Sequence, residues 1–185
     1  MTIYIKYMVS LRCRKIVHTH LDKLGIQYNA INHGEVKVKK KLSAEELLLL
    51  KNKLAKSGFE LMDNKKAKLI EKIKKEIAYL VNNAAELYNV KNSEYLTEKL
   101  NYDYTYMANI FSETTGTTIE QYIIAEKIEL VKELLLYNEL NLTEISYKLN
   151  YCNVAHLSQQ FKKVTGLTPT FFKNIKKKKP IFSVM

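Results

Sequence analysis

The sequence predicts an α+β protein in which a small βαββαβ domain precedes an all-α domain. Three observations predict this class. Strand-like runs are confined to residues 2–62, apolar residues recur at helical spacing after that point, and part of the helical region repeats itself. We therefore expect a first domain over residues 1–62 and a second over residues 63–180.

The first half of the predicted βαββαβ domain shows strand, helix and hairpin patterns in turn. Residues 2–8, "TIYIKYM", alternate as a strand does, and residues 10–25, "SLRCRKIVHTHLDKLG", have helical spacing with Gly25 as a stop. Residues 27–40, "QYNAINHGEVKVKK", predict two short strands joined at His33-Gly34.

The second half adds a helix and a last strand. Residues 43–58, "SAEELLLLKNKLAKSG", predict a helix that starts with a Ser43–Glu46 capping box and stops at Gly58. Residues 59–62, "FELM", then return to the sheet. This order matches the split βαβ plan, in which two helices lie on one face of a small sheet.

The helical part contains an internal repeat. Laying residues 100–116 on residues 149–166 aligns a Leu-Asn-Tyr triplet, a phenylalanine and a final glycine, with one extra residue in the second copy. Each copy is the centre of a predicted helix-turn-helix unit, over residues 92–116 and 141–166, and a long helix over residues 119–137 joins the two units.

The turn of each unit has the residues that a chain reversal needs. Asn101 and Asn150 lie at the reversal, and asparagine is one of the few non-glycine residues that tolerate left-handed backbone angles. Asp103 and Asn153 follow as N-caps of the second helix in each unit.

The second helix of each unit has a small, polar flank. Its apolar residues, such as Met107 and Phe111, are four apart and face the core. The other side fits the major groove of DNA, where amides can bond adenine in bidentate fashion. A single polar flank is common on any surface helix, but two matched copies favour DNA binding. The candidate DNA-contacting residues are Tyr104, Thr105, Ala108, Asn109, Ser112, Asn153, Val154, Ala155, Ser158, Gln159 and Lys162.

These segments resemble a known family. "LTEISYKLNYCNVAHLSQQFKKVTGLTPTFFK", residues 142–173, resembles the second helix-turn-helix of AraC-type transcription regulators, and residues 96–135 resemble the first helix-turn-helix with the linking helix. The resemblance implies a transcription regulator that places two recognition helices in successive major grooves of double-stranded DNA, with RNA polymerase as a further partner. The sequence departs from the family where Asn109 and Gln159 replace a frequent groove-facing arginine.

The net charge of +11, from 30 Lys and Arg against 19 Asp and Glu, predicts a polyanionic partner, with nucleic acid first. The charge is unevenly distributed. Residues 93–179 carry 11 Lys against 10 acids, whereas residues 1–61 carry 12 Lys and Arg against 5 acids. We therefore expect non-specific DNA affinity to depend on the N-terminal part of the chain.

The N-terminal domain leaves its role open. "MVSLRC", residues 8–13, resembles the Met-x-Cys-x-x-Cys loop of heavy-metal-associated domains, which are ferredoxin-like, but Ser10 replaces the first cysteine. Cys13 is the remaining candidate ligand, because His18 and His20 are two residues apart and point to different sides of a helix. A metal-sensing or metal-trafficking protein is thus the alternative, and a metal-free module for homodimerisation or a partner protein is favoured. We expect no metal and no cofactor.

Other classes of function have little support. No catalytic constellation, phosphate-binding loop or zinc spacing is present, so we expect no enzyme activity. Cys13 and Cys152 are the only cysteines, which favours the reducing cytoplasm. Lys6 interrupts the first apolar run, so no signal-peptide core is expected, and no run is long enough to predict a membrane partner.

Overall fold

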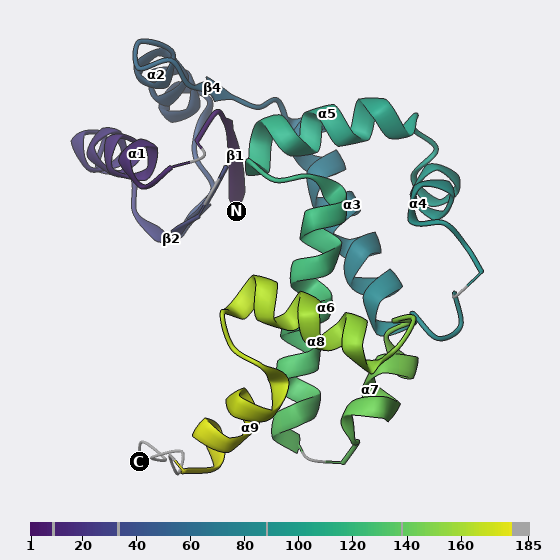
Figure 1. Cartoon of the computed structure of the whole chain (residues 1–185). Coiled ribbons are helices and arrows are strands. Elements are labelled where there is room, and N and C mark those ends of the chain that lie inside the picture. The colour runs from purple at the N-terminus through teal and green to yellow at the C-terminus, as the bar shows by residue number, and fades with distance from the viewer. Residues whose placement is uncertain (9, 33, 88, 138, 179–185) are drawn as a thin grey trace. The chain divides into compact units, whose positions relative to one another are not determined.

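The computed structural model describes residues 1–8, 10–32, 34–87, 89–137 and 139–178 of the chain (Figure 1). It is an α+β structure, as predicted. Its contacts divide the chain into two compact units, Met1–Lys74 with Leu96–Ile119, and Lys75–Tyr95 with Glu120–Met185. The elements are β1 (Thr2–Lys6), α1 (Leu11–Lys23), β2 (Tyr28–Asn32), β3 (Glu35–Val38), α2 (Ala44–Ala55), β4 (Glu60–Leu61), α3 (Asn64–Asn82), α4 (Asn92–Leu100), α5 (Tyr104–Thr115), α6 (Ile119–Tyr137), α7 (Leu142–Lys148), α8 (Val154–Thr165) and α9 (Pro169–Lys178).

The first six elements confirm the predicted βαββαβ order. Their strands form one sheet in the order β2-β3-β1-β4, with every pair antiparallel. The register pairs Ile3 with Val36 and Ile5 with Leu61. Gly34, between β2 and β3, has a φ of 70°. His33, the other residue of the predicted turn, lies outside the described residues.

The predicted capping residues shape both helices of the sheet domain. The Ser43 hydroxyl accepts a hydrogen bond from the Glu46 amide, and the Glu46 carboxylate accepts one from the Ser43 amide, which confirms the capping box of α2. Gly25 and Gly58, after α1 and α2, both have positive φ. These left-handed residues let the chain leave each helix and return to the sheet.

One face of the sheet packs against α1 and α2, which lie on the same side of it in Figure 1. Ile3 and Ile5 point to this side from β1, because alternate residues of a strand share a face. They meet Leu21 of α1 and Leu50 of α2, which are fully buried. The amphipathic pattern of both helices thus produces the predicted packing.

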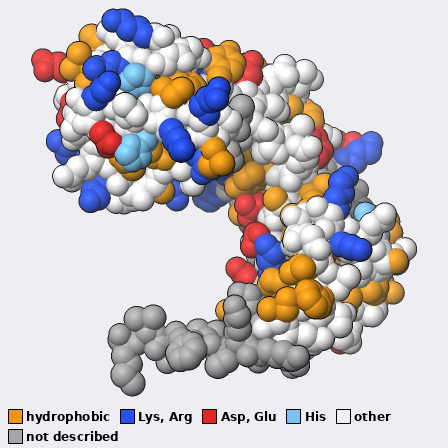
Figure 2. All heavy atoms as spheres, turned by 60° about the vertical axis from the view of Figure 1, so that its left-hand side comes forward, with side chains coloured by type: hydrophobic (Ala, Val, Ile, Leu, Met, Phe, Trp, Pro, Cys, Tyr) orange, Lys and Arg blue, Asp and Glu red, His pale blue; other side chains and the backbone are white. Residues whose placement is uncertain are grey.

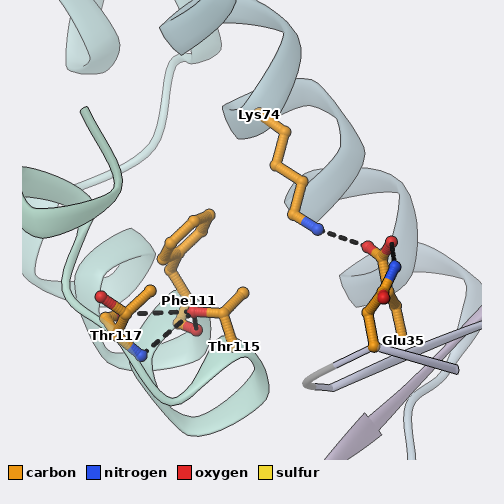
Figure 3. Close-up of polar contacts among 6 residues, drawn as sticks. Glu35, Lys74, Phe111, Thr115 and Thr117 are labelled. Atoms are coloured by element: carbon orange, nitrogen blue, oxygen red, sulfur yellow. Dashed lines mark hydrogen bonds and ion pairs between the residues drawn. The ribbon is translucent and has the colours of Figure 1, made fainter. Parts of the chain in front are cut away.

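The opposite face of the sheet is also covered. Tyr4 and Lys6, which alternate with the core isoleucines, are buried there. The ammonium group of Lys74, on α3, lies 5.3 Å from the centre of the Tyr4 ring and forms an ion pair with Glu35 of β3, as Figure 3 shows. The beginning of α3 is therefore attached to the sheet by charge as well as by packing.

The end of α5 packs against the same side of the sheet. The amide of Tyr7 donates a hydrogen bond to the carbonyl of Glu113 over 3.1 Å, and the Glu113 carboxylate lies 2.8 Å from the Lys6 ammonium group. The side-chain hydrogen bond from Lys6 to the Glu113 carboxylate raises the pKa of Lys6. The Thr114 hydroxyl, buried at the end of α5, lies 3.0 Å from the sulfur of Met62. The sequence contained no signal for this packing, and the predicted domain boundary near Met62 stays a prediction.

The Glu35–Lys74 pair predicts a pH dependence of stability. Burial alone raises the pKa of Glu35, but the hydrogen bond and charge of Lys74 outweigh it, so the pKa lies below its ordinary value of 4.5. Glu35→Gln should lower the free energy of unfolding at pH 7 by about 1.5–3 kcal/mol. The difference from the parent protein should shrink as the pH falls through the lowered pKa of Glu35, because protonation removes the ion pair.

Urea unfolding of both proteins between pH 3 and pH 7 measures this difference. Glu71→Gln is the matched control, since Glu71 lies on the exposed side of α3. A difference between Glu35→Gln and the parent that stayed constant down to pH 3 would contradict the stabilising role of the carboxylate.

The second unit has its own core around α6, α7 and α8. Tyr151, in the turn between α7 and α8, is buried in it, and burial raises the pKa of this phenol to about 12. Lys127 of α6 donates a hydrogen bond to the Leu149 carbonyl over 2.8 Å and lies 5.3 Å from the Tyr151 ring centre. Burial lowers the pKa of Lys127. The fully buried residues of this core include Ile128, Val131, Ile145, Leu149, Leu157 and Phe161.

Among the described residues, no helix combines the length and the apolar composition that a membrane crossing requires.

Candidate nucleic-acid interface

The two helix-turn-helix units have the same turn geometry, which confirms the predicted roles of their asparagines. Asn101 and Asn150 adopt left-handed backbones with φ of 56° and 57°. The Asp103 carboxylate accepts a hydrogen bond from the amide three residues later over 3.0 Å, and the Asn153 side-chain oxygen does the same over 2.8 Å. Each second helix, α5 or α8, therefore starts at the predicted N-cap.

The ends of α5 and α8 are also alike. The Thr115 hydroxyl oxygen lies 2.8 Å from the Phe111 carbonyl and 3.1 Å from the Thr117 carbonyl, as drawn in Figure 3. Thr165 has the same two distances to the carbonyls four residues before and two residues after it. The glycine that follows each threonine is left-handed, with φ of 73° and 77°. The sequence repeat is thus a repeat of backbone structure.

The extra residue of the second copy lies in its turn. The core phenylalanine lies eight positions after the N-cap in both copies, so the insertion falls between Asn150 and Asn153. It gives the two aligned tyrosines different environments. Tyr151 is 6% exposed and packs in the core, whereas Tyr102 is 44% exposed and stacks on Tyr106 with ring centres 5.9 Å apart.

Each second helix has an apolar inner side and an accessible outer side. Met107 and Phe111 on α5, and Leu157 and Phe161 on α8, are fully buried, as the four-residue spacing predicted. All of the candidate DNA-contacting residues lie outside the cores. Thr105, Asn109, Asn153, Ala155, Gln159 and Lys162 are exposed, and Tyr104, Ala108, Ser112, Val154 and Ser158 are half-buried.

The candidate residues form matched pairs when they are counted from the N-caps. Asn109 lies six residues after Asp103, and Gln159 lies six residues after Asn153. Both amides are exposed at the same helical position. Asn153 differs from the others, because its side-chain oxygen accepts the capping hydrogen bond and its amide nitrogen is the group left to meet an external acceptor.

Sequence reasoning missed one exposed side chain beside this surface. Tyr106, in the first turn of α5, is exposed and stacks on Tyr102. The signal was present, because tyrosines alternate with other residues at positions 102, 104 and 106. Tyr102 precedes the N-cap Asp103, and Tyr106 lies in the first turn of the helix that follows. Their proximity therefore depends on where the helix begins.

The loop that resembles a metal-binding loop has a different structural role. The Ser10 hydroxyl accepts a hydrogen bond from the Cys13 amide over 3.2 Å and so caps the first turn of α1. The imidazole of His18 pairs with Asp22, and that of His20 lies 2.8 Å from the Ser57 hydroxyl. Among the described residues, no group of three metal-ligating side chains comes together. Nothing in this loop supports the metal-sensing alternative.

The fold and the two matched units define a helix-turn-helix class of domain. The family described as "Helix-turn-helix domain" matches residues 96–175. This segment is an AraC-type helix-turn-helix domain, which confirms the family that its sequence resembles.

Known proteins similar to the chain fall in the same class. The HTH-type transcriptional regulator YtdP of Bacillus subtilis is 26% identical over 82 residues, which is 44% of this chain and 11% of YtdP. The HTH-type transcriptional regulator YobQ of the same organism is 29% identical over 98 residues, which is 53% of this chain and 39% of YobQ. The chain thus spans only a small part of these curated relatives.

A solved structure shares the fold of the helical region. The C-terminal domain of AraT, a response regulator from Geobacillus stearothermophilus, aligns with a TM-score of 0.52 at 20% sequence identity, and the alignment covers 63% of this chain and 90% of that domain. At this level of identity the likeness concerns the fold alone.

Proposed function

We propose that the protein is a sequence-specific, DNA-binding transcription regulator. One observation carries the proposal: Asn109 and Gln159 are exposed at the same position of two helix-turn-helix units with the same backbone geometry. Amide side chains at such positions can bond the edges of bases, and adenine in bidentate fashion. A single polar flank is common on any surface helix, but two matched copies favour DNA binding.

The proposed binding mode places α5 and α8 in successive major grooves. The linking helix α6 has 19 residues. A helix of this length is about 28 Å long, and one turn of B-form DNA is about 34 Å. A modest bend of the duplex accounts for the difference. The expected operator is therefore asymmetric, with two unequal halves one helical turn apart, because the flanks of α5 and α8 differ in sequence.

The N-terminal domain is proposed to follow the ferredoxin-like plan and to regulate or recruit rather than to read bases. Its element order and its sheet order, β2-β3-β1-β4, support that plan. Its packing against the end of α5 supports a regulatory role, since any change in the sheet reaches a recognition helix directly. RNA polymerase and a second copy of the chain are the partners proposed for it, and the protein is proposed to act in the cytoplasm without catalysis.

Selection from a pool of random duplexes tests the proposal with the full chain. The expected consensus is bipartite, with its two halves centred about 10 base pairs apart. Enrichment of no sequence, or of a single short element with no second half, would contradict the proposed mode.

Gln159→Ala should relax the preference at one or two adjacent base pairs of the second half. The expected loss of affinity for the selected site is about 1–3 kcal/mol, because a bidentate amide contact is removed. Fluorescence anisotropy on the selected duplex and its point variants measures both effects. Gln160→Ala is the control, since it removes a neighbouring amide outside the predicted face. An equal loss on every sequence would instead make Gln159 a phosphate contact.

A further inference from the structure

We propose that a groove beside α1 in the N-terminal domain binds a small carboxylate that carries an apolar chain or ring. The groove has a volume of about 490 Å³ and lies where α1 faces the end of β2. This volume is within the usual range for small-molecule sites. Its lining residues are Leu11, Arg14, Lys15, His18, Thr19 and Ile31.

The apolar part of the ligand is inferred from the hydrophobic lining. Leu11, at the start of α1, is 67% exposed, and Ile31 of β2 is half-buried at the other side of the groove. Ile31 packs partly against the core of the sheet domain, and the rest of its side chain and the exposed part of Leu11 leave apolar surface in water. Covering that surface with a hydrocarbon group is favourable.

The acidic part of the ligand is inferred from Arg14. Arg14 is half-buried and lines the groove. The planar guanidinium group presents several donors in a geometry that matches a carboxylate. A carboxylate in the groove would pair with this guanidinium group.

The other groups around the groove leave it positively charged. Lys15 is exposed beside Arg14, whereas the hydroxyl of Thr19 already donates to the Lys15 carbonyl over 3.0 Å. His18 is held by Asp22, with its Nδ1 2.7 Å from the carboxylate, and its ring packs on Tyr28. The acid that faces this region is thus paired with a histidine, and none of the described residues that line the groove is a carboxylate. This charge selects an anion and disfavours a metal cation.

A ligand with both a charge and an apolar part fits this lining better than the alternatives do. Figure 2 shows one face of the N-terminal part of the chain, on which Lys, Arg and His side chains and a few acidic ones lie among hydrophobic ones. A polynucleotide would pair with the charged groups but would not cover the apolar lining. A neutral hydrocarbon would cover the apolar lining but would not pair with the charge of Arg14. A compact amphiphilic acid meets both requirements.

Isothermal titration of the full chain with octanoate, below its micelle concentration, tests the proposal. Saturable binding with one site is expected, and octan-1-ol at the same concentrations should bind at least tenfold more weakly because it lacks the charge. Arg14→Gln should weaken octanoate binding about tenfold or more, since it removes a charge-assisted hydrogen bond. Leu11→Ser should weaken it through the loss of apolar contact.

Arg12→Gln is the matched control, because Arg12 is an exposed arginine of the same helix that does not line the groove. It should retain the parent affinity. Circular dichroism and thermal melting establish that each variant is folded before it is titrated. An absence of saturable binding, an equal loss in the Arg12 and Arg14 variants, or binding to anionic lipid vesicles without binding to monomeric octanoate would overturn the proposal. None of these measurements involves DNA, so failure of this site and failure of the proposed regulator function are separable.

Discussion

Gly34→Ala is expected to lower the free energy of unfolding of the N-terminal unit by about 2–5 kcal/mol. Two effects add. Gly34 has a φ of 70°, which costs an alanine about 1–2 kcal/mol. A Cβ at this position would also lie 1.6 Å from the Thr114 carbonyl oxygen, so the sheet and the end of α5 must move apart. Urea unfolding followed by circular dichroism measures the loss.

Gly25→Ala separates the two effects. Gly25 also has a positive φ, 65°, but a Cβ there would meet nothing within 4 Å. This control should therefore lose only the backbone contribution, about 1–2 kcal/mol. If Gly34→Ala and Gly25→Ala lost the same free energy, the close approach of the sheet to Thr114 would not exist in solution.

Phe161→Ala is expected to cost about 3–5 kcal/mol of the stability of the C-terminal unit. The Phe161 ring is fully buried and meets the edge of the Phe172 ring, with centres 5.6 Å apart. Its removal leaves a cavity between α8 and its neighbours, because the surrounding helices relax only in part. Chemical unfolding of the full chain should show an earlier transition for this unit, and specific DNA binding at the second half of the operator should be lost with it.

Phe171→Ala is the control for the size of the side chain. Phe171 is 54% exposed, so its removal should cost less than about 1 kcal/mol. A small effect of Phe161→Ala, close to that of Phe171→Ala, would show that α8 is not packed through this ring. The repeat offers an independent check, since Phe111→Ala should have a similar cost in the other unit.

Much of the local structure could be predicted from the sequence because its causes are local. The capping box at Ser43 and Glu46, the left-handed turns at Asn101 and Asn150, and the N-cap at Asp103 depend on residues a few positions apart. The buried faces of α5 and α8 likewise follow from helical spacing. Helical spacing also identified candidate DNA-contacting residues that all lie outside the core.

Two features of the structure could not be predicted from local sequence patterns. The aligned tyrosines in the two turns differ in burial, since Tyr151 lies in the core and Tyr102 is exposed. The groove beside α1 is lined by Arg14 of α1 and Ile31 of β2, which belong to different elements. Neither a residue's accessibility in an irregular turn nor a contact across elements is encoded in a local pattern.

The sequence by itself determined the order of the elements, their caps, the repeat and the family of the helical domain, since each depends on neighbouring residues or on spacing along one helix. Only the tertiary structure decided that the second face of the sheet is covered, by Lys74 of α3 and by Glu113 and Thr114 of α5. Lys6 illustrates the reason. In the sequence it is a charge that interrupts a strand, and only partners far along the chain, Glu60 and Glu113, make its burial favourable.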